Sequence, residues 1–416
     1  MNIGSKIISI LIYLYILLQP ILPSKYKIGR IPFNGDIILL LIILMYFLSI
    51  LIFADSRKRF IEGIKDFFTS YISIFMFALI VMMFISVSYA TDKIIALSET
   101  IRFSTYIILF FVIKYEMNKR KIIDIMLKLY IIVTSIIGII GIFEGIYGIG
   151  FIQKSEHGIR DRIFSTMENS NNLGVFMVIA IFPIIMIALN EKNRRKKIIF
   201  SLLSILILAN IVLSFSRNAW IGFAIGCVIL SVIYNWKIIL GLITMGVAAI
   251  FIPAISNRLS EFTDPTQNLS RIKLWDIAGF MIKDHPIRGI GNGNYRVLYD
   301  KYKLLLKQKI EYYPSNDFHP HNIFLKIQSE LGIFGTIAFI GTVIFIILRI
   351  IKFNREIKDR FYTPFFKGFT ASLIAFISMN FIDNFFSAPK VIAFFWLLIA
   401  CFEAIMYRDK QESDYY

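Results

Sequence analysis

The stretch NLGVFMVIAIFPIIMIALN, from Asn172 to Asn190, runs directly into EKNRRKK at residues 191–197. The first part carries no charged side chain, and its length is close to the roughly 20 apolar residues that a helix needs to cross a bilayer. The second part concentrates Lys and Arg, which mark loops on the cytoplasmic side of a membrane. Together they predict one membrane-spanning helix and its orientation.

The same alternation extends over the whole chain. Its 416 residues are 57% hydrophobic and only 18% charged, whereas soluble domains are about 45–50% apolar and about 25% charged. We expect about twelve transmembrane helices and the fold class of an all-α polytopic membrane protein. The apolar runs lie at residues 7–22, 37–54, 71–90, 94–113, 122–147, 172–190, 198–213, 218–234, 237–253, 322–348, 364–386 and 389–407.

The distribution of basic residues orients these helices. With the N-terminus in the cytoplasm, the inner loops hold more than twice as many Lys and Arg residues as the short outer loops, as the positive-inside rule requires. Both termini are therefore predicted to be cytoplasmic. The net charge of +17 follows from these loops, and we expect no nucleic-acid partner.

One polar region interrupts the apolar runs and divides the chain into three parts. Residues 1–253 hold nine predicted spans, residues 254–321 form a large extracytoplasmic loop, and residues 322–416 hold the last three spans. Within the loop we expect two short helices, at 271–284 and 294–310, separated by a turn. The second is basic and amphipathic, which suits either the membrane surface or packing on the tops of the spans.

Three arginines fall on the predicted outer face, at the ends of spans or in the large loop. They are Arg162, Arg217 and Arg271. Guanidinium groups bind phosphate oxygens through paired, charge-assisted hydrogen bonds. If the three converge, they predict a site for a multiply charged anion such as a diphosphate. The alternative for each one alone is an interfacial arginine that extends toward water.

The histidines offer a candidate base. His321 lies where the large loop re-enters the membrane, and a neutral imidazole there could take a proton from a hydroxyl group; a structural histidine is the alternative. His319 and His321 form a His-x-His pair, but no carboxylate or Cys cluster at ligand spacing accompanies them, so we expect no metal. The glycine-rich segment at 289–293 lacks the nucleotide-binding pattern and predicts a turn, and no cofactor is expected.

Several charged residues lie within predicted spans, and the sequence does not assign their roles. They are Glu99, Arg102, Lys326, Glu330 and Asp383. The spacings of three and four predict that Glu99 pairs with Arg102 and Lys326 with Glu330. A proton path through a transporter is the rival interpretation, because ionisable residues inside membranes often serve transport.

These motifs together resemble the O-antigen ligase/polymerase family over residues 150–350. The resemblance rests on Arg162 with Asn171 and Asn172, S-R-x-A-W around Arg217, R-x-x-x-W at Arg271–Trp275, H-P-x-x-G-x-G-x-G-x-Y at His285–Tyr295 and HNIFLKIQSELGIFG from His321. The family often has Pro-Asn where this chain has Ser170-Asn171, a departure that bears on Arg162.

The resemblance implies a metal-independent, inverting glycosyltransferase of the GT-C type in the bacterial inner membrane. It implies that a glycan leaves an undecaprenyl-diphosphate carrier for an acceptor sugar hydroxyl on the periplasmic or extracellular face. By the same resemblance His321 is the catalytic base and Arg162, Arg217 and Arg271 bind the donor diphosphate. Arg288, Tyr295, Asn171 and Asn322 are candidate supporting residues. The implied partners are the lipid-linked donor, a glycan or lipid-linked acceptor, membrane lipids and a chain-length regulator.

Other functions remain open from the sequence. A polymerase would join repeat units of a surface polysaccharide, and a ligase would attach a finished chain to a lipid core. The sequence leans slightly toward polymerase. A lipid-linked oligosaccharide flippase or another transporter is the alternative without chemistry, although the two six-span halves do not resemble each other as transporter halves often do. A protein O-oligosaccharyltransferase would use the same donor with a Ser or Thr acceptor.

Overall fold

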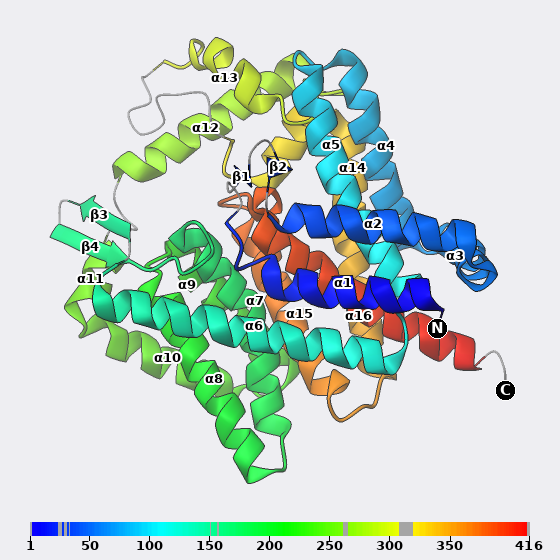
Figure 1. Cartoon of the computed structure of the whole chain (residues 1–416). Helices are drawn as coiled ribbons and strands as arrows, with labels where there is room; N and C mark the ends of the chain where they lie inside the picture. The colour runs from blue at the N-terminus through cyan, green and yellow to red at the C-terminus, as the bar shows by residue number, and fades with distance from the viewer. Residues whose placement is uncertain are drawn as a thin grey trace.

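The computed structural model describes residues 2–23, 27–28, 31–32, 34–149, 151–155, 158–260, 265–307 and 319–413. Helices dominate the described chain (Figure 1). They are α1 (Ile3–Leu18), α2 (Gly35–Ile52), α3 (Ala54–Phe67), α4 (Tyr71–Tyr89), α5 (Lys93–Phe111), a π-helical turn η1 (Val112–Glu116), α6 (Arg120–Tyr147), α7 (Ser170–Asn190), α8 (Arg194–Leu213), α9 (Arg217–Ile233), α10 (Lys237–Ile250), α11 (Pro253–Ser260), α12 (Pro265–Asp284), α13 (Tyr295–Lys303), α14 (Ile323–Glu356), α15 (Tyr362–Met379), a 3-10 turn η3 (Phe385–Ser387) and α16 (Pro389–Ser413).

Each of the twelve predicted apolar segments forms a helix. Eight helices within the described ranges are long and apolar enough to cross a membrane, and α10 with α11 would add a ninth as one bent span. Two others, α1 and α9, are apolar but shorter than a full span of this kind. The structure thus shows a multi-helical membrane protein, and the count of twelve spans stays a prediction.

Two features were not predicted. The amphipathic helix α3 occupies what the sequence suggested was an inner loop, with exposed apolar residues such as Ile61 beside Lys58 and Lys65. Two short antiparallel hairpins also form, β1 (Lys27–Ile28) with β2 (Ile31–Pro32) and β3 (Phe151–Ser155) with β4 (Gly158–Arg162). The second hairpin ends at Arg162, so it carries the chain to the candidate site.

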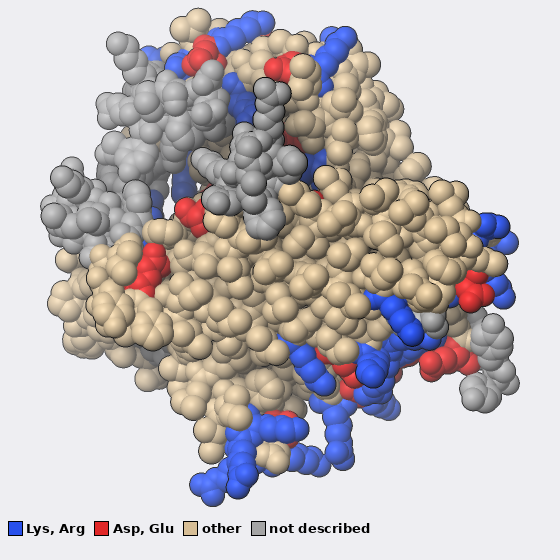
Figure 2. Space-filling model, viewed as in Figure 1, with Lys and Arg blue, Asp and Glu red and all other residues tan. Residues whose placement is uncertain are grey.

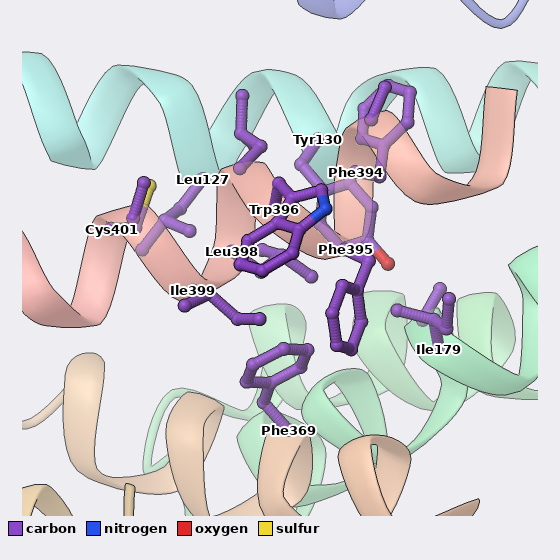
Figure 3. Packing of buried hydrophobic residues seen from close by; sticks show 14 of the residues in the cluster. Leu127, Tyr130, Ile179, Phe369, Phe394, Phe395, Trp396, Leu398, Ile399 and Cys401 are labelled. Carbon is purple, nitrogen blue, oxygen red and sulfur yellow. The ribbon is translucent and has the colours of Figure 1, made fainter. Parts of the chain in front are cut away.

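Two helices, α7 and α16, are enclosed by the rest of the bundle. Their spans are 89% and 94% buried, against 17% for α8. Figure 3 shows Trp396 of α16 among Tyr130 of α6, Ile179 of α7 and Phe369 of α15. Because lipid tails are as apolar as these side chains, close packing rather than the hydrophobic effect holds such helices together.

The contact between α7 and α15 shows how the packing tolerates a proline. Pro183 lies inside α7 and cannot donate to the carbonyl one turn earlier, that of Ile179. The hydroxyl of Ser372 on α15 donates to this carbonyl at 2.7 Å. Opposite, a Cβ on Gly368 would lie 2.3 Å from the Phe182 carbonyl oxygen, so only glycine fits there. The neighbouring helix therefore supplies the bond that the proline removes.

Helices α12 and α13 with the segment 285–294 between them form a separate layer at the top of Figure 1, which we call the outer lobe. Helix α12 begins earlier and α13 ends earlier than predicted, because Pro265 starts the first helix and the second is only nine residues long. Tyr295, Tyr299 and Tyr302 of α13 pack against α12. The apolar side of this amphipathic segment therefore faces α12 within the lobe, an arrangement that neither interpretation of the sequence specified.

The two termini lie together on the right in Figure 1, away from the outer lobe. Lys and Arg lie at the lower and right-hand edges of Figure 2 and also along its top, and a largely uncharged band crosses the middle of this face. Such a band suits contact with lipid. The side of the membrane on which each end lies remains the prediction made from loop charge.

Candidate functional site

His321 lies two residues before the start of α14. It has a positive φ of 46°, a conformation that non-glycine residues adopt at a cost of roughly 1–3 kcal/mol and that often occurs at functional sites. The next residue, Asn322, caps α14 by accepting hydrogen bonds from the amides of Phe324 and Leu325. This candidate supporting residue thus fixes the start of the helix and, with it, the position of His321.

A carboxylate orients the imidazole of His321. Nδ1 lies 2.8 Å from Oδ1 of Asp383, which is 62 residues away in the connection between α15 and α16. Burial opposes ionisation of Asp383, but the adjacent His321, with His319 and Arg271, holds its pKa below the usual range. An ionised carboxylate only accepts, so Nδ1 carries the proton and Nε2 is the basic nitrogen of the neutral ring.

The position of Asp383 corrects one prediction. The sequence placed it inside a span at 364–386, but α15 ends at Met379. Asp383 therefore lies in a connection that also contains the 3-10 turn η3. The sequence offered only an unassigned acidic residue, because nothing in it indicates which histidine a residue so far along the chain will meet.

His319 stands beside the dyad and extends the group of ionisable residues. Its Nδ1 accepts a hydrogen bond from the amide of His321 at 3.2 Å. Burial, with the nearby His321 and Lys326, lowers its pKa to about 3, so the ring is neutral near pH 7. Ligand atoms of His319, His321 and Asp383 lie within 4.8 Å of one another and could hold a metal ion. The sequence did not reveal that the Asp383 carboxylate lies beside the two histidines.

Charge around this group opposes a cation. Arg271 acts on Asp383 and Lys326 acts on His319 closely enough to shift their pKa values. Positive neighbours weaken the binding of a divalent ion. The absence of a metal requirement therefore stays a prediction, now with an electrostatic argument in its favour.

A second cluster surrounds the turn between α8 and α9. Phe215, in this turn, has a positive φ of 46°. Arg162 donates from Nε to the carbonyl of Ser214 at 2.9 Å, and Arg258 of α11 donates from Nε to the carbonyl of Phe215 at 3.0 Å. Arg217 is the first residue of α9. The structure thus brings Arg162 and Arg258 onto one turn, with Arg217 directly after it; sequence analysis missed Arg258. The convergence of Arg162, Arg217 and Arg271 on one diphosphate stays a prediction.

One arginine of this cluster contacts a candidate supporting residue. Arg162 donates from Nη2 to Oδ1 of Asn171 at 3.0 Å, so Asn171 holds this guanidinium in place. The departure at Ser170 does not disturb that contact. Arg258 is only 5% exposed. No motif signalled it, because it lies outside the family patterns and reaches the turn from α11.

The arginine turn and the His321–Asp383 dyad are linked through the end of α15. Asn218, one residue after Arg217, donates from its side chain to the carbonyl of Met379 at 3.0 Å. The amide of Ile323, two residues after His321, donates to the carbonyl of Asn380 at 3.0 Å. Neighbouring residues of one helix end therefore contact both parts of the site, which fixes them on the same end of the bundle.

The glycine-rich segment serves the outer lobe. The carboxylate of Glu330 accepts hydrogen bonds from the amides of Gly293 at 2.9 Å and Tyr295 at 3.2 Å. Gly293 has a φ of 69°, and the predicted turn is confirmed. The Tyr295 hydroxyl donates to the carbonyl of Leu274 at 2.8 Å, inside the lobe. Tyr295 therefore stabilises the lobe, and its described contacts do not include the dyad.

The other residues that the sequence singled out make contacts away from the His321–Asp383 dyad and the arginine turn, or pair as their spacing predicted. Arg288 stacks over the ring of Tyr89, 5.6 Å from its centroid, at the top of α4. Glu99 pairs with Arg102, and Lys326 pairs with Glu330 at 3.1 Å, as the spacing predicted. His157 lies outside the described residues. Of the candidates, the structure thus groups His321, Arg271, Arg162, Arg217, Asn171 and Asn322 at one end, and gives Arg288 a separate contact.

Comparison with known proteins points to one family. Residues 202–340 match the family model described as O-Antigen ligase. A protein of Rickettsia conorii, named "Putative polysaccharide ligase", is 27% identical over 244 residues, covering 54% of this chain and 58% of the relative. A protein of the same description from Rickettsia felis is 28% identical over 218 residues, covering 47% of this chain and 51% of the relative.

The chain thus matches little more than half the length of these two relatives. The matched region of the family model holds Arg217, Arg258, Arg271 and His321, together with the glycine-rich turn and the first half of α14. It contains most of the residues from which the family resemblance was inferred. Residues 202–340 thus resemble the O-antigen ligase family in the part of the chain that holds these candidate residues.

Proposed function

We propose that this protein is a membrane glycosyltransferase that moves a glycan from a polyprenyl-diphosphate carrier to an acceptor hydroxyl. The observation that carries the proposal is the hydrogen bond of 2.8 Å between His321 and Asp383, on the same helix ends as the arginine turn. It supports a base with a fixed tautomer at the same end of the bundle as cations that suit a diphosphate. The family supports the same class of chemistry.

In the proposed reaction, the acceptor oxygen attacks the anomeric carbon of the donor glycan. Nε2 of His321 takes the hydroxyl proton as the new C–O bond forms. The bond between the anomeric carbon and the phosphate oxygen breaks, and its electron pair leaves with the lipid diphosphate. Attack opposite the leaving group inverts the anomeric carbon. Asp383 keeps the proton on Nδ1 and stabilises the imidazolium that results.

The arginines account for the departure of the carrier. Negative charge grows on the bridging phosphate oxygen in the transition state, and fixed guanidinium groups lower the barrier where they contact that charge. A diphosphate held in this way leaves without a general acid. A second catalytic carboxylate, of the kind that glycosidases require, is therefore unnecessary.

Arg162, Arg217 and Arg271 are the proposed ligands of the diphosphate, and Arg258 joins them as a positioning residue. Arg162 and Arg258 hold adjacent carbonyl groups of one turn. That turn begins α9, so its conformation sets the direction of Arg217. Loss of either contact would release a backbone with a positive φ, and the arginine that follows would lose its alignment.

The acceptor separates a ligase from a polymerase. The two rickettsial relatives carry the name of polysaccharide ligase, which favours attachment of a finished chain over the polymerase that the sequence slightly favoured. The proposed setting is the bacterial inner membrane, with the site on the outer face and both termini in the cytoplasm. The chain-length regulator is a proposed partner of the polymerase alternative only.

The decisive experiment mixes purified protein in lipid nanodiscs with a polyprenyl-diphosphate oligosaccharide and candidate acceptors, and resolves the products. One conjugate on a glycolipid acceptor supports a ligase, a ladder of products on the carrier supports a polymerase, and a Ser- or Thr-linked product supports protein glycosylation. Movement of the intact donor across the bilayer with no new bond would refute the enzyme and leave a flippase.

A further inference from the structure

A cavity of about 540 Å³ opens at the end of the bundle that lies away from the candidate site. It lies between the turn before α4 and the final turns of α14 and α16. Helix α14 begins next to His321 and is kinked at Gly332. The part after the kink, residues 333–356, alone spans roughly 36 Å at about 1.5 Å per residue. The bilayer core is about 30 Å thick, so the cavity and the site lie at opposite membrane boundaries.

A buried ionic network forms the floor of this cavity. Lys114 lies in the π-helical turn η1, with only 2% of its side chain exposed, and pairs with Asp66 and Glu403 at 3.1 Å each. Arg349 donates to both oxygens of Glu403, from Nε at 2.7 Å and Nη2 at 3.0 Å. Those contacts leave Nη1 of Arg349, a cavity-lining residue, available to a ligand at the floor.

The mouth of the cavity carries the carboxylates of Glu356 and Asp409 as well as two lysines, and its wall is aromatic. Lys352 and Lys410 have 57% and 67% of their side chains exposed, and their ion pairs are long, with Glu356 at 3.6 Å and Asp66 at 4.0 Å. Exposed pairs of this kind are weak, so another anion can compete for the lysines. Tyr71 stacks on Phe345 with their ring centroids 5.1 Å apart and is 64% exposed.

We infer that this cavity binds a phospholipid with an anionic headgroup. The phosphate contacts Lys352, Lys410 and Nη1 of Arg349, and an acyl chain lies along the wall formed by Tyr71 and Phe345. A phospholipid combines a charged head with an apolar tail and is present at this depth of every membrane. Aromatic residues at the boundary and lysines beside it are the groups that contact such lipids.

The first test measures retained lipid. The full chain is purified in mild detergent, and native mass spectrometry counts the molecules that carry one phosphatidylglycerol after titration with that lipid. Wild type is compared with K352Q/K410Q and with a control, K196Q/K197Q, which removes two exposed lysines outside the cavity. Each lysine beside an anionic head contributes a factor of about five, so the cavity variant should bind about 25-fold more weakly and the control unchanged.

A second variant separates the shape of the cavity from its charge, and a second ligand separates a lipid from a free anion. S70W fills the cavity without changing charge and should also abolish the adduct. Phosphatidylglycerol should raise the melting temperature of wild type, whereas inorganic phosphate at the same concentration should not. Equal binding by wild type and both cavity variants would overturn the inference, as would a phosphate effect equal to that of the lipid.

Discussion

The charged side chains at the two ends of α14 differ in how completely they are paired and buried. At the end predicted to be cytoplasmic, which we call the inner end, Glu403 receives hydrogen bonds from Arg349 and a close ion pair from Lys114, and the carboxylate is fully buried. At the outer end, His321 is held by one carboxylate, carries a positive φ and has 18% of its side chain exposed. A closed network suits stability, and a strained, partly exposed group suits chemistry. The difference predicts which substitutions change folding and which change turnover.

The largest effect should follow from H321A. Removal of the base should lower transfer by about 10²–10⁴-fold, while binding of the lipid donor stays near that of wild type. Turnover with purified donor and donor binding are measured separately in nanodiscs. Retained turnover with lost binding would contradict the base role and place His321 among the ligands of the donor.

At the inner end, E403Q should affect the fold instead of the reaction. It leaves Lys114 and Arg349 without their shared buried carboxylate, and breaking such a pair typically costs about 3–5 kcal/mol. Thermal unfolding in detergent measures the loss, and turnover per folded molecule should be unchanged. E62Q is the matched control, since Glu62 pairs with Lys58 at 3.9 Å on an exposed surface, where an ion pair contributes about 0–1 kcal/mol. A melting temperature for E403Q like that of E62Q would remove the proposed contrast between the two ends.

D383N tests whether the outer carboxylate acts through His321. An amide at 383 can accept only through one oxygen and lacks charge, so both the tautomer and the imidazolium lose support; we expect turnover to fall by on the order of 10²-fold. The KM for the donor should stay unchanged. Adding D383N to H321A should then cost nothing further, whereas additive losses would show that the two residues act separately.

A smaller effect is expected from R217K and R258K. Each keeps the positive charge but loses the planar, paired donors of arginine. R258K also loses the bond from Nε to the Phe215 carbonyl, which is now 3.0 Å. We expect the donor KM to rise about tenfold with the acceptor KM unchanged, measured against R195K, an exposed arginine on the α7–α8 side. Equal KM values for R217K and wild type would indicate an arginine that merely extends toward water.

The smallest expected effect is on the stability of the protein at acidic pH. His319 has a pKa of about 3 in the fold against 6.5 in the unfolded chain, so the unfolded state binds a proton that the folded state does not. Stability is complete above pH 6.5 and falls as the pH drops toward 3. Between pH 7 and pH 5, the melting temperature of H319Q should therefore fall by less than that of wild type. An identical loss in both proteins would assign the acid sensitivity to another group.

The sequence predicted the helices well because apolar runs are a local signal. All twelve runs form helices, and the ion pairs at spacings of three and four are present. Helix ends were less accurate: α15 stops before Asp383, and α13 stops at Lys303. Ends depend on caps and tertiary contacts that hydropathy does not contain.

The site was predicted in part, for a related reason. Motif spacing pointed to Arg162, Arg217, Arg271 and His321. It gave no indication of Asp383 or Arg258, because their partners are 62 and 43 residues away along the chain. Contacts of that range arise from the packing of α15 and α11, which one sequence does not reveal. The amphipathic α3 was missed because its basic residues were counted as loop charge.

The anchoring of the outer lobe limits how a bulky glycan can enter. Glu330 holds the amides of Gly293 and Tyr295, and Gly332 lies so close to the Ile287 carbonyl that a Cβ would be 2.0 Å from it. On another side, the amide of Asn292 donates to the Ser86 hydroxyl at 3.1 Å and the amide of Asp92 donates to the Asn294 side chain at 2.7 Å. A glycan of the proposed reaction would therefore have to reach the site past a lobe that is fixed to the bundle on two sides.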